Sequence, residues 1–372
     1  MTKTSGWLEE RLKEIQGLEQ YSIEDSLAEL ITGMGPNSFT KLDANENFFI
    51  PISTLKSIFK EVSRDLDPRV YPISEEKILV NELKDHFGFD SDQIVIGNGA
   101  DQIIELIAKA FLKDSESAVA IKPTFSMYSV TVNSLRKKYI EVPLNDDFSL
   151  NIDALLSRVT KKTVVCFICT PNNPTANQFK ISEIERFTEE FEGIVALDEA
   201  YVEFAPYSMI KLVDRFENLI VLRTFSKVFG LAGMRVGYSV ANSRLSSVLM
   251  RIKPPYNINS FSLRAALGIL REKSTVNRAL LRLKVERNLL IERLNRIQGI
   301  KAFSSDTNFV LFNIHGDSNY VFKELLGRRI LVKNVGRILS QNGYLRTSVG
   351  LPEMNAKLLN ALEDICGSET KR

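Results

Sequence analysis

Short apolar runs alternate with helical patterns through the middle of the chain. Between the runs, apolar positions recur at helical spacing, as at Ile103, Ile107 and Ala110, and Ser182 with Glu185 predicts a capping box that opens another helix. Uninterrupted apolar runs of this length are typical of strands buried on both faces of a parallel sheet. The pattern therefore predicts an α/β fold with crossover helices. The runs cover residues 94–96, 118–121, 163–169, 194–197 and 219–222.

The pattern changes after about residue 260. Apolar residues from Val276 to Ile297 follow one face of a long helix, and Gly299 is placed to end it. A strand at 309–314 and a helix ending near Gly327 come next. This mixture predicts a second, smaller α+β domain.

Both ends of the chain are predicted to join this smaller domain. Pro352 opens a last helix, and Leu8 with Leu12 marks a helical face near the start of the chain. We therefore expect a large, mostly parallel α/β domain over 45–265. The small α+β domain would combine 1–44 with 266–372.

Length and composition narrow the class of protein. The 372 residues suggest about two or three domains. Lys and Arg number 48 and Asp and Glu 46, so a formal charge of +2 gives no general attraction to nucleic acid or anionic membranes. No apolar run approaches the roughly 20 residues that span a bilayer, and the first residues lack a secretory pattern. Three cysteines form no disulfide framework, which indicates a cytoplasmic compartment.

Metal chemistry is not expected. His86 and His315, the two histidines, lie far apart in the sequence. Cys166 and Cys169 have the spacing of a metal or redox pair, but residues three apart on a strand face opposite sides. Both cysteines are therefore predicted to be buried strand residues.

Polar residues follow several of the predicted strands, where open α/β sheets bind ligands. Gly97-Asn98-Gly99-Ala100-Asp101 leads into a helix, and its backbone N–H groups suit a phosphate. The sequence completes neither a Walker A loop nor a dinucleotide fingerprint, so a plain tight turn is the alternative.

Two further strand ends carry polar side chains. The loop 170–175 places Asn173 between prolines, where an amide could hold a planar polar ligand or only shape the loop. Asp198 ends the next buried strand and needs a partner, because burying an unpaired carboxylate is costly. A ligand or a helix cap would each supply that partner.

Segment 223–238 is the most informative. Lys227 could act as a nucleophilic amine, since the pKa of a lysine changes readily on burial. Thr224, Ser226 and Arg235 could grip a phosphate. Without further context, a solvated surface lysine remains the alternative.

Together these motifs resemble a known family. Asn173, Asp198, Tyr201 and the string from Ser226 to Gly237 match, in order and spacing, the fold-type-I aminotransferases that use pyridoxal 5′-phosphate. The resemblance covers roughly residues 40 to 350. Segments 42–47 and 345–350 are similar to those of histidinol-phosphate aminotransferases.

The chain departs from that subfamily at two places. Phe48 and Phe49 follow Ala-Asn-Glu-Asn, where the family usually has Pro and a nearby Gly. Tyr21 follows Gln20, whereas the corresponding tyrosine usually follows Pro.

The resemblance implies roles around the cofactor. Lys227 would bond to the cofactor aldehyde and then move the proton, and Asp198 would pair with the ring nitrogen. Asn173 and Tyr201 would bond the ring oxygen, and Tyr128 would stack on the ring face. The phosphate would lie against the backbone of Ala100 and Asp101 and the side chains of Thr224, Ser226 and Arg235.

The resemblance also implies a homodimer with shared sites. Tyr71 resembles the tyrosine that reaches the cofactor phosphate from the other subunit. Arg346 resembles the arginine that holds the α-carboxylate of an amino acid. The candidates for the phosphate and imidazole end of the substrate are Tyr21, Asn45, Tyr256 and Arg337.

The expected activity exchanges an amino group between L-histidinol phosphate and 2-oxoglutarate in a ping-pong cycle of histidine biosynthesis. An aromatic amino-acid aminotransferase and a threonine-phosphate decarboxylase are alternatives that use the same cofactor. A non-catalytic binding relative would have no need of Lys227 with Asp198. A NAD-dependent reductase is disfavoured by the incomplete glycine fingerprint.

Overall fold

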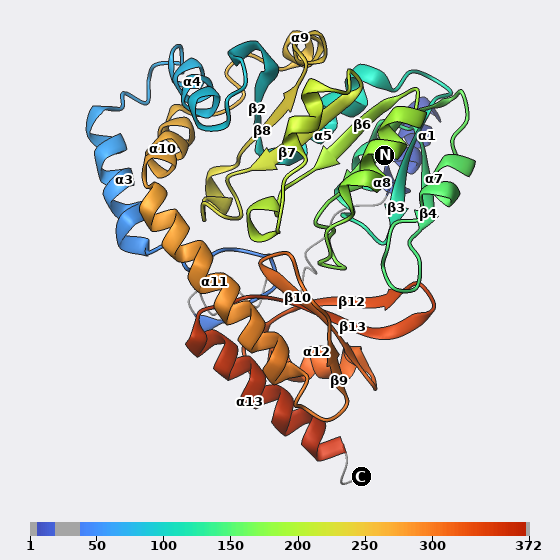
Figure 1. Ribbon diagram of the computed structural model, residues 1–372, viewed down its shortest axis with the longest axis vertical. Helices are drawn as coiled ribbons and strands as arrows, with labels where there is room; N and C mark the ends of the chain where they lie inside the picture. Colours follow the sequence, from blue (N-terminus) through green and yellow to red (C-terminus); the bar gives the residue numbers. More distant parts are fainter. Residues whose placement is uncertain (1–5, 19–37, 370–372) are drawn as a thin grey trace.

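A computed structural model describes residues 6–18 and 38–369 of the chain. Figure 1 shows two units, a large one around a seven-stranded sheet and a smaller one around a four-stranded sheet. The long helix α11 (Lys273–Leu294) runs from one unit to the other.

The large sheet confirms the predicted α/β class. Among its described strands, β8 alone runs antiparallel to its neighbours. The predicted apolar runs form five of its buried strands. The buried strand Val236–Ala241 was not among the predictions, and the edge strand Lys138–Pro143 is largely open to solvent and carries no such run. The strands lie in the order β2 (Ile94–Asn98), β8 (Val236–Ala241), β7 (Leu219–Thr224), β6 (Ile194–Asp198), β5 (Thr163–Cys169), β3 (Ser117–Lys122) and β4 (Lys138–Pro143).

Helices cover both faces of this sheet (Figure 1). Each buries an apolar stripe, so helical periodicity and packing agree. Around the sheet lie α5 (Gly99–Phe111), α6 (Met127–Ser134), α7 (Ile152–Ser157), α8 (Ile181–Glu190) and α9 (Ser243–Ile252). At one end α10 (Ser260–Arg271) packs on α3 (Ile52–Asp65) and α4 (Glu75–Phe87). Short 3₁₀ turns cover Ser91–Gln93, Val202–Phe204, Ile210–Asp214 and Ala232–Met234.

The predicted capping box of α8 is wrong. The helix begins at Ile181, and Glu183 accepts the backbone N–H of Lys180 at 3.1 Å. Ser182 therefore lies inside the first turn, and Glu185 instead pairs with Arg215 across the surface.

The smaller unit combines an antiparallel sheet with helices, as the predicted α+β class requires. Its antiparallel sheet has the order β12 (Lys333–Ile338), β13 (Gln341–Ser348), β10 (Phe309–Ile314) and β9 (Ile300–Ala302). The long helix α11, α12 (Ser318–Gly327) and α13 (Pro352–Glu369) confirm the predicted helices. Gly299 does not end α11 as expected, because the helix stops at Leu294 with Asn295 as its C-cap, and Gly299, with a φ of 83°, lies in the turn beyond it.

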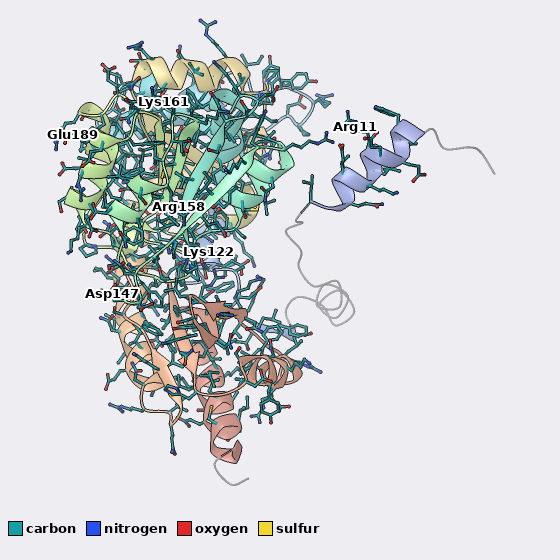
Figure 2. The ribbon with its side chains drawn as sticks, turned by 90° about the vertical axis from the view of Figure 1, so that its right-hand side faces the viewer. Arg11, Lys122, Asp147, Arg158, Lys161 and Glu189 are labelled. Carbon is teal, nitrogen blue, oxygen red and sulfur yellow. The ribbon has the colours of Figure 1, made fainter. Side chains whose placement is uncertain are left out.

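The N-terminal segment divides between the two units. β1 (Thr40–Lys41) pairs in parallel with β11 (Ile330–Leu331) of the smaller unit. The first helix, α1 (Gly6–Gln16), forms as predicted but stands beside the large unit, where Glu14 pairs with Arg136 at 3.0 Å (Figure 2). Leu8 and Leu12 on α1 are exposed. In the described part of the chain, no helix is long and apolar enough to cross a membrane.

Candidate active site

One pocket, of about 240 Å³, opens where β5, β6 and β7 end and α5 begins. It gathers residues from four of the motifs found in the sequence. Eight predicted site residues line it: Ala100, Asp101, Asp198, Tyr201, Thr224, Ser226, Lys227 and Arg235. The other lining residues are Ala44, Glu46, Phe125, Cys169, Ala200 and Ala232.

An anion cradle forms one end of this pocket. Gly99 begins α5 with a φ of 72°, and its N–H donates to the carbonyl of Arg235 at 2.9 Å. The guanidinium of Arg235 lies 2.7 Å from Asp101. A Cβ on Gly99 would come within 2.6 Å of that guanidinium, which could move aside, so glycine is favoured here mainly by its positive φ. The first-turn N–H groups of α5 have no partners within the helix and present positive charge.

Two hydroxyls extend the cradle along the end of β7. Thr224 Oγ1 donates to Ser226 Oγ at 3.0 Å, and the N–H of Ser226 donates back to Thr224 Oγ1 at 3.1 Å. A Cβ on Gly237 of β8 would meet the backbone nitrogen of Ala100 at 2.5 Å. Glycine there lets β8 approach the helix start closely enough to join these groups.

Lys227 lies between the cradle and the loop around Ala44. Its amine donates to the carbonyl of Ala44 at 3.2 Å and lies 5.6 Å from the centre of the Tyr201 ring. Burial lowers the pKa of Lys227 to about 8, and nearby Arg346 acts in the same direction. An appreciable fraction of neutral amine is therefore available near neutral pH.

Asp198 is 2% exposed and ends β6 on the floor of the pocket. The N–H of Ala200 donates to one carboxylate oxygen at 3.0 Å, and the hydroxyl of Tyr128 donates to the other at 2.6 Å. Burial raises the pKa of Asp198 to about 6, although both hydrogen bonds oppose that change. Asp198 is thus largely a carboxylate at neutral pH.

The structure places Tyr128 behind the pocket, whereas the sequence placed it on the cofactor. Its ring is fully buried and stacks on Phe167 with centroids 5.0 Å apart. The aromatic side chain that lines the pocket is Phe125, edge-on to Tyr128 at 5.6 Å. The position of Phe125 just beyond β3, rather than within α6, was the sequence signal that could have found it.

Arg346 brings the smaller unit to the site. Its guanidinium donates to Asn173 Oδ1 and to the carbonyl of Asp43, both at 2.6 Å. It lies over the ring of Phe309 at 5.2 Å and is 9% exposed. The predicted Arg346 and Asn173 are therefore in direct contact.

Asn45 contacts a predicted cofactor residue. Its side-chain amide donates to the hydroxyl of Tyr201 at 3.0 Å, and its N–H donates to Ser348 Oγ at 2.8 Å. Asn45 is 2% exposed. Asn45 therefore orients the Tyr201 hydroxyl, and Ser348, in the segment 345–350, holds the backbone of Asn45 in turn.

Three predicted residues do not reach this pocket within the chain. Tyr71 and Tyr256 stack on each other at 4.7 Å, and their side chains are 70% and 52% exposed. Arg337 is exposed, donates to the carbonyl of Leu339 at 3.0 Å and lines a separate hollow near α12. Tyr21 lies outside the described residues.

Lys333 is a candidate that the sequence reading missed. It is the direct partner of Arg346 across the antiparallel pair of β12 and β13. Directly opposed residues project to the same face of a sheet. Only the strand register reveals this relationship, because 12 residues separate the two in the chain.

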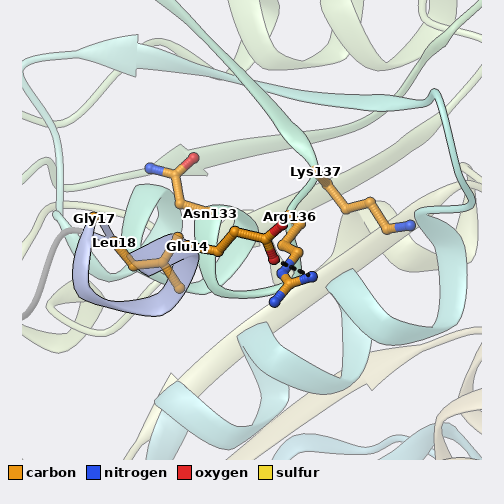
Figure 3. Close-up of a pocket in the computed structure, with 6 residues that line it drawn as sticks. All are labelled: Glu14, Gly17, Leu18, Asn133, Arg136 and Lys137. Carbon is orange, nitrogen blue, oxygen red and sulfur yellow. Dashed lines mark ion pairs between the residues drawn. The ribbon is translucent and has the colours of Figure 1, made fainter. Parts of the chain in front are cut away.

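A second hollow, shown in Figure 3, lies between α1 and the end of α6. Its one drawn interaction is the ion pair between Glu14 and Arg136. It holds none of the predicted site residues, and we assign no chemistry to it. The lining residues are Glu14, Gly17, Leu18, Asn133, Arg136 and Lys137.

Comparisons with known proteins identify the fold and the family. The sequence model of the aminotransferases of class I and II matches residues 38–362. The crystal structure of a histidinol-phosphate aminotransferase from Sinorhizobium meliloti, in complex with pyridoxal-5′-phosphate, superposes with a TM-score of 0.85. It is 22% identical and covers 99% of this chain and 98% of its own. The corresponding protein of Clostridium acetobutylicum gives 0.80 at 24% identity, with 88% and 98% covered. These likenesses show the fold.

Two relatives are similar enough in sequence to show the family. The histidinol-phosphate aminotransferase of Caldanaerobacter subterraneus subsp. tengcongensis is 37% identical over 95% of this chain and 97% of its own length. That of Methanocaldococcus jannaschii is 35% identical over 90% and 91%. The chain therefore belongs to the histidinol-phosphate aminotransferase family, within the aminotransferases of class I and II.

Proposed function

We propose that the protein transfers the amino group between L-histidinol phosphate and 2-oxoglutarate in a ping-pong cycle of histidine biosynthesis. One observation carries the proposal: a lysine of lowered pKa, a buried carboxylate and an anion cradle line the same pocket. The family to which the chain belongs supports the choice of reaction.

The pocket fits pyridoxal 5′-phosphate, the cofactor of this family. The cradle of α5, Thr224, Ser226 and Arg235 suits its phosphate, and the carboxylate of Asp198 suits its ring nitrogen. Asn173 and Tyr201 would hold the ring oxygen. We assign the ring face to Phe125, which lines the pocket, in place of Tyr128.

When bound, the cofactor supplies an aldehyde that exchanges the amino group and a ring that withdraws electrons from the reacting carbon. The protein provides the proton chemistry. Lys227 would take the proton from the substrate carbon and deliver it to the carbon of the cofactor that carried the aldehyde, and a pKa of about 8 suits an amine for both transfers. Asp198 would keep the proton on the ring nitrogen. Asn45 would hold Tyr201 in position through the hydrogen bond that it donates to the Tyr201 hydroxyl.

Two substrates must use one site in turn. Arg346 would bind the α-carboxylate of glutamate, since its planar guanidinium can hold a carboxylate in two hydrogen bonds. Histidinol phosphate has no α-carboxylate but carries a phosphate. We assign that phosphate to Lys333 beside Arg346, in place of Arg337, with Tyr256 and Tyr21 as the other candidates.

We propose a cytoplasmic homodimer with shared sites. Tyr71 and Tyr256 present a stacked, exposed aromatic pair, as expected of side chains that complete a partner's pocket. Residues 45–265 would bind the cofactor, and 266–372 with 1–44 would bring Arg346 to it, with α1 beside the large unit as the exception.

A visible absorbance spectrum tests the proposal directly. The protein is loaded with pyridoxal phosphate and mixed with histidinol phosphate without any keto acid. We expect the visible band of the bound cofactor to disappear, and 2-oxoglutarate to restore it. A band that responds only to phenylalanine or tyrosine would instead indicate an aromatic amino-acid aminotransferase. A protein that binds no cofactor would overturn the catalytic assignment.

A further inference from the structure

The contact between Tyr128 and Asp198 lies behind the pocket floor and has no place in the roles described so far. Tyr128 is fully buried on α6, and its hydroxyl donates to Asp198 Oδ2 at 2.6 Å. The backbone N–H of Ala200 occupies the other oxygen at 3.0 Å. The carboxylate thus has one donor on each oxygen.

We propose that Tyr128 is a positioning residue for the cofactor, which fixes the orientation of Asp198 and favours its charged form. The inference rests on the proposed function, because it requires the pyridine ring to bind against Asp198.

The Tyr128 hydroxyl acts electrostatically on the charge of the Asp198 carboxylate. Burial alone favours a neutral carboxyl group, which could not keep a ring nitrogen protonated. A short hydrogen bond from a neutral donor stabilises the carboxylate and opposes burial. The same burial, together with the charge of Asp198, holds the pKa of Tyr128 well above its usual value, so the phenol keeps its proton and remains a donor.

Packing fixes where this hydroxyl points. The Tyr128 ring lies nearly parallel to Phe167, at an angle of 6°, and meets Phe125 edge-on at 88°. Phe125 itself lines the pocket. One side chain therefore supports both the carboxylate and the aromatic wall.

The chain offers variants that separate these two effects. Tyr128→Phe removes the hydroxyl and keeps the ring contacts. Phe167→Leu removes the stacked ring and keeps the hydroxyl. Comparing the two distinguishes loss of the hydrogen bond from loss of packing.

A pH titration must account for every charged or titratable neighbour of Asp198. Four neighbours other than Tyr128 come from different elements: Asp101 on α5, Cys169 on β5, Tyr201 after β6 and Lys227 after β7. Tyr128→Phe leaves all four residues and the ionisable groups of the cofactor in the protein, and removes only the hydroxyl with its contacts to Asp198 and Cys169. The difference between the wild-type and variant curves therefore reports on the hydroxyl.

The experiment measures the binding of pyridoxal phosphate to the cofactor-free protein over a pH range that spans 6, the approximate pKa of Asp198. We expect wild-type affinity to fall as the pH drops through this region. In Tyr128→Phe the fall should begin about one pH unit higher, and affinity at neutral pH should be about tenfold weaker. Phe167→Leu should keep the wild-type midpoint. Thermal unfolding of each protein checks that it is folded.

A double-mutant cycle adds a second test. Asp198→Asn removes the titrating group, so adding Tyr128→Phe to it should change affinity by less than about twofold. Equal effects of Tyr128→Phe in both backgrounds, or a wild-type midpoint in Tyr128→Phe, would overturn the inference and leave the proposed function intact. A wild-type protein that binds no pyridoxal phosphate would overturn the proposed function itself.

Discussion

Lys333 on β12 lies directly opposite Arg346 on β13, so two cations project from one face of the small sheet. Like charges in this position repel each other. An anion bound between them would remove the repulsion. Both substrates of the proposed reaction carry such an anion.

Lys333→Ala should therefore weaken histidinol phosphate selectively. We expect its kcat/KM to fall about 10- to 100-fold, the usual result of losing a hydrogen bond to a charged group. Arg337→Ala is the matched control, because Arg337 is an exposed cation of the same hairpin that bonds Leu339. Its kcat/KM should stay within about twofold of wild type. A larger loss in Arg337→Ala than in Lys333→Ala would reverse the assignment.

Arg346→Ala should impair glutamate far more than histidinol phosphate. Only glutamate has an α-carboxylate, and losing a buried charged partner costs roughly 2–5 kcal/mol, which is about 30-fold or more in kcat/KM. The measurement compares kcat/KM for both amino donors in separate half-reactions. Removing this cation should also raise the pKa of Lys227, because Arg346 helps to lower it. Equal losses for both donors would contradict the carboxylate assignment.

Lys227→Ala should abolish transamination and leave the thermal unfolding of the cofactor-free protein close to wild type. The amine has no ion pair among its described contacts and donates a single hydrogen bond, to Ala44. Remaining turnover would remove Lys227 from its role.

The pH dependence of this amine can be measured separately. Because burial lowers its pKa to about 8, its neutral fraction rises as the pH passes through that value. Pyridoxal phosphate trapped on the protein with borohydride should appear on the Lys227 peptide with that midpoint. Exposed lysines, with a pKa of about 10.4, should label about two pH units higher and serve as the internal control.

Mixed dimers test whether Tyr71 acts across subunits. A Tyr71→Phe subunit paired with a Lys227→Ala subunit has one site with its own lysine and, if Tyr71 acts in trans, an intact tyrosine from the partner. We expect such dimers to show about half of wild-type activity, since one of two sites is whole. If Tyr71 serves its own chain, activity would not exceed half that of the Tyr71→Phe homodimer.

Asp198→Asn should stabilise the cofactor-free protein while weakening its cofactor binding. The pKa of Asp198 rises from 3.8 to about 6 on folding, so the native state binds the proton more tightly than the unfolded state. This favourable contribution is complete below about pH 4 and is lost as the pH rises through 6. Near neutral pH the buried charge costs about 3 kcal/mol, and asparagine removes that charge but loses an acceptor.

Urea unfolding of the two cofactor-free proteins checks this expectation. We expect Asp198→Asn to be more stable by about 1–3 kcal/mol at pH 8, with the difference vanishing near pH 4. A variant that is less stable at pH 8 would show that the carboxylate stabilises the empty fold.

The site residues that could be predicted from the sequence are those that lie at, or directly after, the end of a predicted strand. Asp198, Thr224 and Lys227 follow buried apolar runs, and the sheet brings such ends together. Tyr128 was misplaced because an aromatic in a motif does not say whether it faces the ligand or the core.

Contacts that depend on the register between two paired strands could not be predicted from the sequence. Lys333 meets Arg346 only through the pairing of two strands with irregular register between Asn334 and Ile338. Arg337 looked equally suitable as a cation, but it lies within that irregular stretch and lines a different hollow. The start of α8 also differed from the prediction, because Glu183, and not Glu185, accepts the N–H of the residue before the helix, Lys180.

The bonds that join the two ends of the site have a consequence for how the protein is made. Arg346 holds the carbonyl of Asp43, and Asn45 holds Ser348, each across 303 residues of sequence. The ribosome delivers the N-terminal partners early, whereas the others emerge only with the last tenth of the chain. The loop that covers Lys227 therefore lacks these two bonds through most of translation. A chain truncated before Arg346 could not form either bond, and its site would stay open.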